Sequence, residues 1–202
     1  MTFKVISDEF PLVLASASPR RKMLLNQVGL PFRVFPTDIE ENNIDGEPPE
    51  IACALAEKKA FSADLISPGS WVLGADTMVV MGEVILGKPR DNEDALYMLE
   101  LLSGREHDVI TGYCLLDPSG HVACKEHVAT KVKVKELSSE ERIEYIATKE
   151  PFGKAGSYAI QGIGSFMVES ITGSYSNVVG LPICRLIKAL RSAGAIKGFP
   201  LL

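Results

Sequence analysis

Leu14–Arg21 reads Leu-Ala-Ser-Ala-Ser-Pro-Arg-Arg and joins the end of a short apolar run to the start of a helix. Ser18 fits the N-cap position and Pro19 the first helical position. A helix N-terminus presents free N–H groups to an anion, and Arg20 and Arg21 add charge and forked donors. The stretch therefore indicates an anion-binding turn, although an ordinary capped helix with solvated arginines has the same pattern.

Apolar periodicity and turn residues extend this opening into an α/β chain. A strand at residues 12–15, the helix that Ser18 begins and a strand at residues 32–35 form a strand-helix-strand unit. Further helices are expected at residues 50–65, 92–102, 139–148 and 182–193, and further strands at residues 71–73, 78–80, 84–86, 107–116, 122–137 and 166–171. Residues 78–80 and 84–86 flank Gly82 and predict a hairpin.

Two segments near the C-terminal half have a pattern of their own. Lys131, Lys133 and Lys135 alternate with Thr130, Val132 and Val134, which predicts a strand with one buried and one wet face. A solvated sheet face explains these lysines better than a phosphate site does. The glycine-rich segment 153–162 predicts sharp backbone turns or a close approach to a ligand.

Composition narrows the function classes. The chain has 202 residues and a formal net charge of -5, which argues against a protein that covers nucleic acid through a basic surface. Cys53, Cys114, Cys124 and Cys184 lack CxxC spacing and indicate neither a zinc site nor a disulfide framework. No secretory signal and no membrane span are recognised, so we expect a cytoplasmic protein.

Carboxylates follow two of the expected strands. Asp76 comes after the strand at residues 71–73, a position where α/β proteins often present catalytic groups, although its spacing alone slightly favours an N-cap or turn aspartate. Glu40 and Glu41 follow the strand at residues 32–35 and are either surface charges or, with Asp76, a hard-oxygen site suited to Mg²⁺.

Other signals are weaker. Lys59, on a charged helix, and Lys88, beside Pro89, fit either solvated lysines or phosphate ligands. The three histidines lack ligand spacing, and no GxSxG, P-loop or dinucleotide fingerprint occurs. Nucleophilic Ser/His catalysis is therefore poorly supported.

A set of motifs in fixed order resembles the Maf family of nucleoside triphosphate pyrophosphatases. The resemblance spans about Leu12 to Leu190 and rests on the following motifs: Ser16-Ala17-Ser18-Pro19-Arg20-Arg21, Glu41, Glu57-Lys58-Lys59-Ala60, Gly74-Ala75-Asp76-Thr77, Lys88-Pro89-Arg90, Ser103-Gly104, Lys154-Ala155-Gly156, Tyr158-Ala159-Ile160-Gln161-Gly162 and Val179-Gly180-Leu181-Pro182. Ala159 stands where the family tends to have glycine, a departure that affects loop mobility and no catalytic group.

The resemblance implies a fold and an activity. The family fold is α/β and elongated, with a mixed, curved central sheet flanked by helices and related to the inosine triphosphate pyrophosphatases. Residues 1–202 would form one domain with two lobes and the active-site cleft between them. The implied protein is a cytoplasmic, metal-dependent enzyme, often a homodimer, that converts a nucleoside triphosphate to the monophosphate and pyrophosphate.

The same resemblance implies residue roles. Asp76 matches the proton acceptor, and Glu41 matches a carboxylate linked to metal and catalysis. Both would hold the divalent cation, Mg²⁺ or Mn²⁺. The phosphate-binding positions correspond to Ser16, Arg20 or Arg21, Lys59 and Lys88.

Substrate choice is also implied. Arg20, Thr77 and Gln161 resemble the set of the branch that acts on dTTP and UTP, whereas the 7-methyl-GTP branch tends to carry Trp, Gln and Glu. A Gln161 amide offers donors and an acceptor that complement uracil or thymine. Two alternatives stay open: a non-enzymatic nucleotide-binding regulator of cell division, and a broader housecleaning pyrophosphatase for modified nucleotides.

Overall fold

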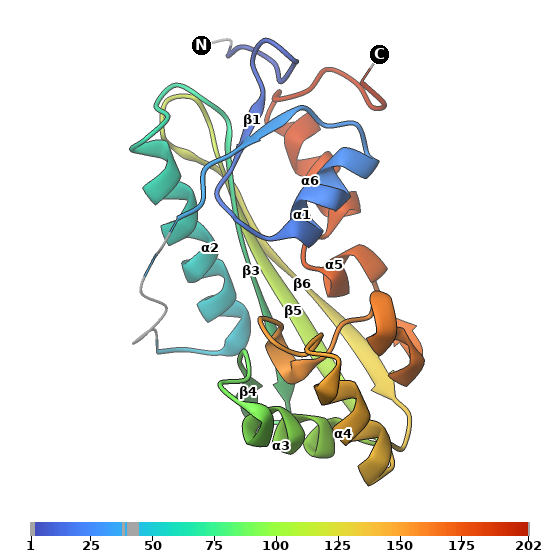
Figure 1. Cartoon of the computed structure of the whole chain (residues 1–202). Coiled ribbons are helices and arrows are strands. Elements are labelled where there is room, and N and C mark those ends of the chain that lie inside the picture. Colours follow the sequence, from blue (N-terminus) through green and yellow to red (C-terminus); the bar gives the residue numbers. More distant parts are fainter. Residues whose placement is uncertain (1–2, 38, 40–44, 202) are drawn as a thin grey trace. The chain divides into compact units, whose positions relative to one another are not determined.

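The computed structural model describes residues 3–37, 39 and 45–201 of the chain (Figure 1). Its helices are α1 (Pro19–Gln27), α2 (Pro48–Asp64), α3 (Asn92–Leu102), α4 (Ser139–Ala147), α5 (Tyr175–Val179) and α6 (Ile183–Ser192), with 3-10 helices η1 (Ala155–Ser157) and η2 (Gly162–Met167). Its strands are β1 (Leu12–Leu14), β2 (Phe32–Val34), β3 (Val72–Met81), β4 (Val84–Leu86), β5 (Glu106–Leu116), β6 (Val122–Val134) and β7 (Val168–Thr172).

The described strands form one mixed sheet in the order β2-β1-β3-β5-β6-β7, with β4 paired to β3. β1 lies parallel to β2 and to β3, with Val13 opposite Arg33 and Val72. The β3–β4 and β6–β7 pairs are antiparallel. The α/β class, the mixed sheet and the strand-helix-strand opening are therefore confirmed.

The chain divides into two compact units. The first comprises Met1–Asp76, Thr111–Val128 and Gly180–Leu202, and the second comprises Thr77–Ile110 and Ala129–Val179. Several strands contribute residues to both units. The expected single domain with an active-site cleft stays a prediction.

In the first unit, α2 lies very close to the sheet because small residues face one another (Figure 1). Ala52, Ala56 and Ala60 are fully buried on α2. A Cβ at Gly74 of β3 would lie 2.1 Å from the carbonyl oxygen of Ala56, and one at Gly112 of β5 would lie 2.4 Å from the carbonyl carbon of Ala52. Only glycine allows this approach of helix and strand.

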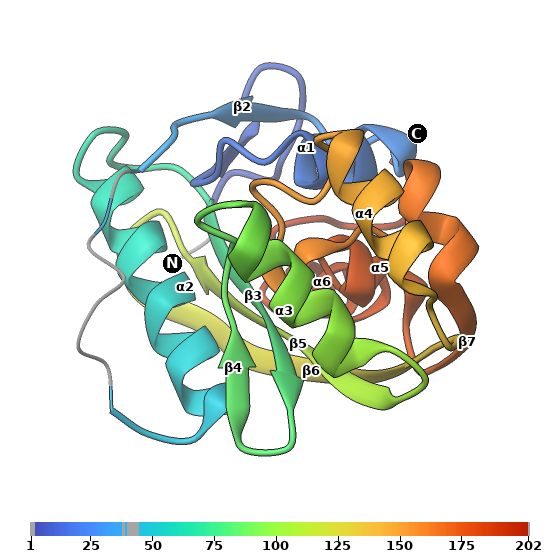
Figure 2. The same ribbon diagram turned by 60° about the horizontal axis from the view of Figure 1, so that its bottom comes forward.

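The second unit has its own apolar core. Figure 2 shows the β3–β4 hairpin, which turns at Gly82 with φ of 60°, and helices α3 and α4 lying against each other. The core includes Val79, Leu99 and Tyr145. Ser138 and Glu141 form a capping box at the start of α4, the helix that was expected at residues 139–148.

The wet face of β6 is occupied by lysines with structural partners. Lys131 forms an ion pair of 3.0 Å with Glu106, and Lys133 donates to the carbonyl oxygen of Gly104 at 2.5 Å. Lys135 forms an ion pair with Glu141. The prediction of a sheet face rather than a phosphate site fits these contacts.

Three sequence-based expectations were wrong. The two strands expected at residues 71–73 and 78–80 are one strand, β3, which begins at Val72 and continues through Gly74, where it packs against α2. Residues 162–167 form η2, so β7 begins only at Val168. β6 ends at Val134, next to a register shift between Lys133 and Val134, and not at residue 137.

Two further features bear on the class of the protein. The four cysteines are free thiols, as their spacing predicted. In the part of the chain that the structure describes, no helix combines the length and the apolar character that crossing a membrane requires.

Candidate functional site

The turn between β1 and α1 has the predicted cap. Ser18 precedes the helix, and its Oγ accepts the backbone N–H of Arg21 at 3.4 Å, with Pro19 in the first turn. The Oγ atom of Ser16 accepts the N–H of Ser18 at 3.3 Å and a guanidinium N–H of Arg21 at 3.0 Å. Both acceptor positions of the Ser16 hydroxyl are therefore used, which leaves its O–H as a donor for a ligand oxygen.

The two arginines have different roles in this turn. Arg21 is buried, and its Nε donates to the carbonyl oxygen of Gly180 at 2.9 Å. Its guanidinium thus ties α1 to the segment before α6. Arg20 is half-buried, and burial lowers the pKa of its guanidinium below its ordinary value. Among the described residues Arg20 has no hydrogen-bond or ion-pair partner, whereas Arg21 is bonded to Ser16 and Gly180.

Lys59 and Asp76 form the central ion pair of the first unit. The Nζ of Lys59 lies 2.6 Å from Oδ1 of Asp76, and both side chains are 12% exposed. The interpretation of Lys59 as a solvated lysine was therefore wrong. An ammonium group has three donors, so Lys59 can contact the carboxylate and a phosphate oxygen at the same time.

The position of this ion pair follows from the close packing of α2. Asp76 lies within β3, whereas the sequence predicted that it follows a strand. Gly74 and Asp76 are two residues apart and share the strand face that meets α2. The contact of Gly74 with Ala56 and Ala60 brings the neighbouring residue of the helix, Lys59, to the carboxylate.

The other predicted residues are not part of the turn or of the ion pair of Lys59 and Asp76. Thr77, Lys88 and Gln161 belong to the second unit, where Lys88 is exposed and Thr77 and Gln161 are half-buried. The backbone at Gly87, next to Lys88, accepts the N–H of Gly156 at 3.0 Å. Glu41, together with Glu40, falls outside the described residues, so its predicted role is untested.

A metal ion would have few protein ligands here. Within residues 3–37, 39 and 45–201, no three His, Cys, Asp or Glu side chains are grouped so as to hold one. Mg²⁺ is commonly bound by one or two carboxylates plus substrate phosphates. The buried carboxylate of Asp76 fits that mode of binding.

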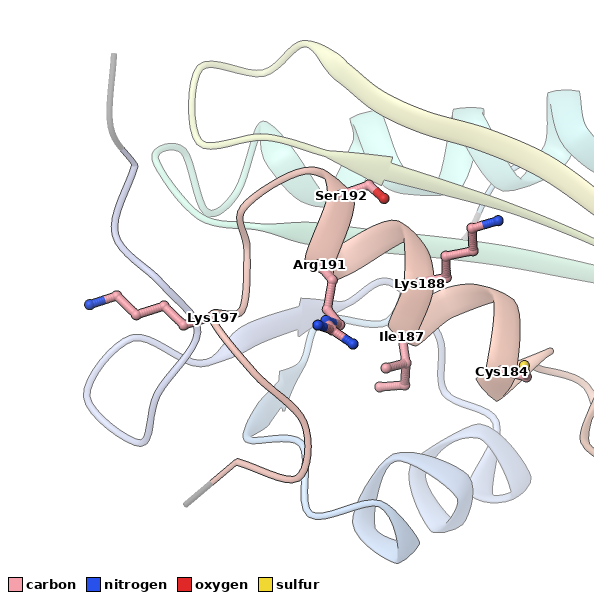
Figure 3. A pocket seen from close by; sticks show the side chains of 6 residues that line it. All are labelled: Cys184, Ile187, Lys188, Arg191, Ser192 and Lys197. Carbon is pink, nitrogen blue, oxygen red and sulfur yellow. The ribbon is translucent and has the colours of Figure 1, made fainter.

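A surface cavity of about 550 Å³ runs along α6 and is lined by Cys184, Ile187, Lys188, Arg191, Ser192 and Lys197. It contains none of the predicted site residues. Figure 3 shows that Lys188, Arg191 and Lys197 point in different directions. These cations do not converge on one anion, and the lining includes no residue of the turn between β1 and α1.

Two features of the site were missing from the predicted residues. Gly180, whose carbonyl holds Arg21, lies in the motif Val179-Gly180-Leu181-Pro182 that the resemblance already contained. Gly74 was named only as part of the motif Gly74-Ala75-Asp76-Thr77, with no role in helix packing. The alanines of α2 at residues 52, 56, 60 and 63 were the available signal, since a helix face of alanines allows close contact with a sheet.

Comparisons with known proteins identify relatives of similar sequence. The chain is 53% identical over 178 residues to the dTTP/UTP pyrophosphatase of Ruminiclostridium cellulolyticum, covering 87% of this chain and 92% of that protein. It is 50% identical to the dTTP/UTP pyrophosphatase of Citrifermentans bemidjiense, with 92% and 96% covered, and 43% identical to that of Aquifex aeolicus, with 93% and 97% covered.

The structure is also similar to solved structures. A nucleoside-triphosphatase / dITP/XTP pyrophosphatase from Mycobacterium abscessus superposes with a TM-score of 0.41 at 14% identity, over 69% of this chain and 95% of that one. The sequence model of the family described as Maf-like protein matches residues 11–193. With this match and relatives of about half-identical sequence over nearly the whole length, the chain belongs to the Maf family.

Proposed function

We propose that this protein is a nucleoside triphosphate pyrophosphatase that acts on dTTP and UTP and releases the monophosphate and pyrophosphate. The observation that carries the proposal is the identity of 43% to 53%, over most of both chains, with relatives named dTTP/UTP pyrophosphatase. The buried pair of Lys59 and Asp76 and the anion-binding turn supply the chemistry that this reaction needs.

Asp76 is the proton acceptor in this proposal. A water oxygen attacks the α-phosphorus, its proton passes to the Asp76 carboxylate, and the bond from the α-phosphorus to the bridging oxygen breaks. The electron pair of that bond leaves on pyrophosphate. Lys59 is bonded to Oδ1 of Asp76 and so holds the carboxylate in one orientation, and its motif assigns it to a phosphate oxygen as well.

The phosphates are held by a hydroxyl donor and by cationic side chains. The Ser16 hydroxyl donates to a phosphate oxygen, and the half-buried guanidinium of Arg20 offers two parallel donors. Lys88 is assigned to the phosphates by its motif. These cations are in place before the reaction and stabilise the charge that develops on the departing pyrophosphate.

We further propose a divalent cation, Mg²⁺ or Mn²⁺, held by Asp76 and Glu41. When bound, the ion withdraws charge from the phosphate oxygens. Asp76 fits the role because its carboxylate is buried and lies within the strand, so that its position is fixed without the ion.

Base selection is assigned to Arg20, Thr77 and Gln161. The Gln161 amide can donate to a carbonyl and accept the N3–H of uracil or thymine. We propose that the enzyme acts in the cytoplasm as a homodimer and without nucleic acid. The net charge of -5 supports the last point, because nucleic-acid binding favours a basic surface.

A panel of nucleoside triphosphates tests the activity. Pyrophosphate and orthophosphate are measured separately for dTTP, UTP, CTP, GTP and 7-methyl-GTP. We expect monophosphate and pyrophosphate from dTTP and UTP at the highest kcat/KM. Early release of diphosphate and orthophosphate would contradict the cleavage site, and a highest kcat/KM for 7-methyl-GTP would contradict the substrate.

A further inference from the structure

A carboxylate from the turn after α4 caps the helix that follows Gln161. Glu150 lies 13 residues before Ile163, and its Oε2 accepts the N–H of Ile163 at 2.9 Å. Its Oε1 accepts the N–H of Gly164 at 3.3 Å. Gln161 is the N-cap residue of this helix, η2, and its own side chain makes no cap hydrogen bond. The cap function is therefore supplied by Glu150.

Tyr145, a side chain of α4, holds the backbone before Gln161. The hydroxyl of Tyr145 accepts the N–H of Ala159 at 3.3 Å, and Tyr145 is 2% exposed. Burial, followed by the negative charge of Glu150, raises the pKa of Tyr145 above its usual value. Its phenol therefore stays neutral and keeps its proton at physiological pH.

The segment leaves space for both contacts because it contains glycine. A Cβ at Gly162 would lie 2.9 Å from Oε1 of Glu150, and one at Gly164 would lie 2.6 Å from the hydroxyl of Tyr145. Gly162 also has a φ of 73°, which favours glycine. The backbone on both sides of Gln161 is thus shaped to receive these two side chains.

We propose that Glu150 and Tyr145 are positioning residues that fix Gln161 for base selection. They bond the backbone two residues before Gln161 and two and three residues after it, so the amide of Gln161 is carried on a segment fixed at both ends. The inference rests on the proposed function, in which Gln161 contacts the base. It assigns no contact with the substrate to Glu150 or Tyr145.

The test compares kcat/KM for dTTP with that for CTP in Glu150→Ala, Glu150→Gln and Tyr145→Phe. Glu144→Ala is the control, because Glu144 is an exposed glutamate of α4, the helix that carries Tyr145 and precedes Glu150. Loss of bonds to a charged acceptor should lower the dTTP/CTP ratio by about tenfold in Glu150→Ala, mostly through KM for dTTP. Glu150→Gln keeps one acceptor oxygen and should lose less, and Glu144→Ala should lose nothing.

The Gln161→Ala background separates positioning from a merely structural role. If Glu150 acts through Gln161, adding Glu150→Ala to Gln161→Ala leaves the dTTP/CTP ratio unchanged. Equal loss on both nucleotides in Glu150→Ala, or a further fall of the ratio in the double variant, would overturn the inference. Thermal unfolding of each variant identifies any loss of folded protein.

Amide hydrogen exchange gives a readout that does not depend on activity. The N–H groups of Ile163 and Gly164 should exchange faster in Glu150→Ala, while those of α3 keep their rates. Unchanged exchange at these two amides would overturn the cap. A wild-type protein with no preference for dTTP over CTP would instead contradict the proposed function, and the positioning role with it.

Discussion

The ammonium nitrogen of Lys59 lies 2.6 Å from Oδ1 of Asp76, although the two residues are 17 positions apart in sequence. The contact depends on Gly74, where α2 approaches the strand too closely for any side chain. The close packing at Gly74 therefore places Lys59 beside Asp76, the proposed base.

Asp76→Asn should abolish most turnover and leave the fold intact. The amide keeps the size of the side chain and an acceptor for Lys59, but it cannot take a proton from water. General-base catalysis contributes about 10²–10⁴-fold, so kcat should fall by at least that range. Steady-state kinetics at saturating Mg²⁺, with circular dichroism as the folding control, measures this. Near-normal kcat in a folded variant would assign the base elsewhere.

Arg20 and Arg21 should respond differently to substitution. Arg20→Ala should raise KM for dTTP roughly tenfold with little change in stability, because it removes a phosphate contact. Arg21→Lys should lower the free energy of unfolding by about 1–3 kcal/mol, because lysine cannot bond Ser16 and Gly180 at the same time. Urea unfolding and steady-state kinetics of both variants check the assignment. The opposite pattern would exchange the two roles.

Gly74→Ala should destabilise the protein and displace Lys59. The new Cβ would lie 2.1 Å and 2.7 Å from backbone atoms of Ala56 and Ala60, and backbone cannot move aside as a side chain can. We expect a loss of about 2–3 kcal/mol in the free energy of unfolding and a lower kcat. Gly198→Ala is the control, because a Cβ there meets nothing within 4 Å. Equal urea midpoints for the two variants would refute the close contact.

Stability should fall in acid because of His107. Burial lowers the pKa of this imidazole from 6.5 to about 4, and its Nε2 lies 2.7 Å from the hydroxyl of Tyr158. Between these pH values the unfolded chain binds a proton that the folded chain does not, so the free energy of unfolding decreases as the pH falls. The contribution of this residue reaches about 3 kcal/mol near pH 4.

Urea unfolding across this pH range measures the effect of His107. The difference in stability between wild type and His107→Gln isolates it, since glutamine can bond the Tyr158 hydroxyl but does not titrate in this range. A difference that stays constant from about pH 7 to about pH 4.5 would contradict the buried neutral imidazole.

Removal of divalent cations should stop the reaction. A chelator is expected to abolish pyrophosphate release from dTTP, and Mg²⁺ or Mn²⁺ should restore it, because both ions suit oxygen ligands. The melting temperature should change less than the activity, since the ion–carboxylate contact is not part of the core. Full turnover in the chelated protein would exclude the proposed cation.

Local signals in the sequence predicted most of the elements. The Ser18 cap, the Ser138–Glu141 capping box and helix α3 agree with the structure because each depends on residues close together in sequence. The place of Asp76 was missed for the opposite reason. Whether Gly74 makes a turn or accepts a helix depends on α2, which no local pattern around Gly74 reveals.

The sequence predicted which residues form the candidate site but not the contacts between them. The ordered motifs named Ser16, Lys59 and Asp76, and the structure brings Lys59 and Asp76 into contact. The sequence does not reveal that Arg21 is bonded to Ser16 and Gly180, whereas Arg20 has no bond to another described residue. Adjacent arginines on a helix differ only in the direction that they face. The partner that separates them, Gly180, lies 159 positions away.

The position of Asp76 inside β3 has a consequence for how the gene can change in length. Side chains alternate between the two faces of a strand, so the deletion or insertion of one residue between Gly74 and Asp76 would move the carboxylate to the opposite face, away from Lys59. A loop would absorb such a change. Homologous chains that retain the activity should therefore vary in residue type around this aspartate while keeping its spacing from the glycine fixed.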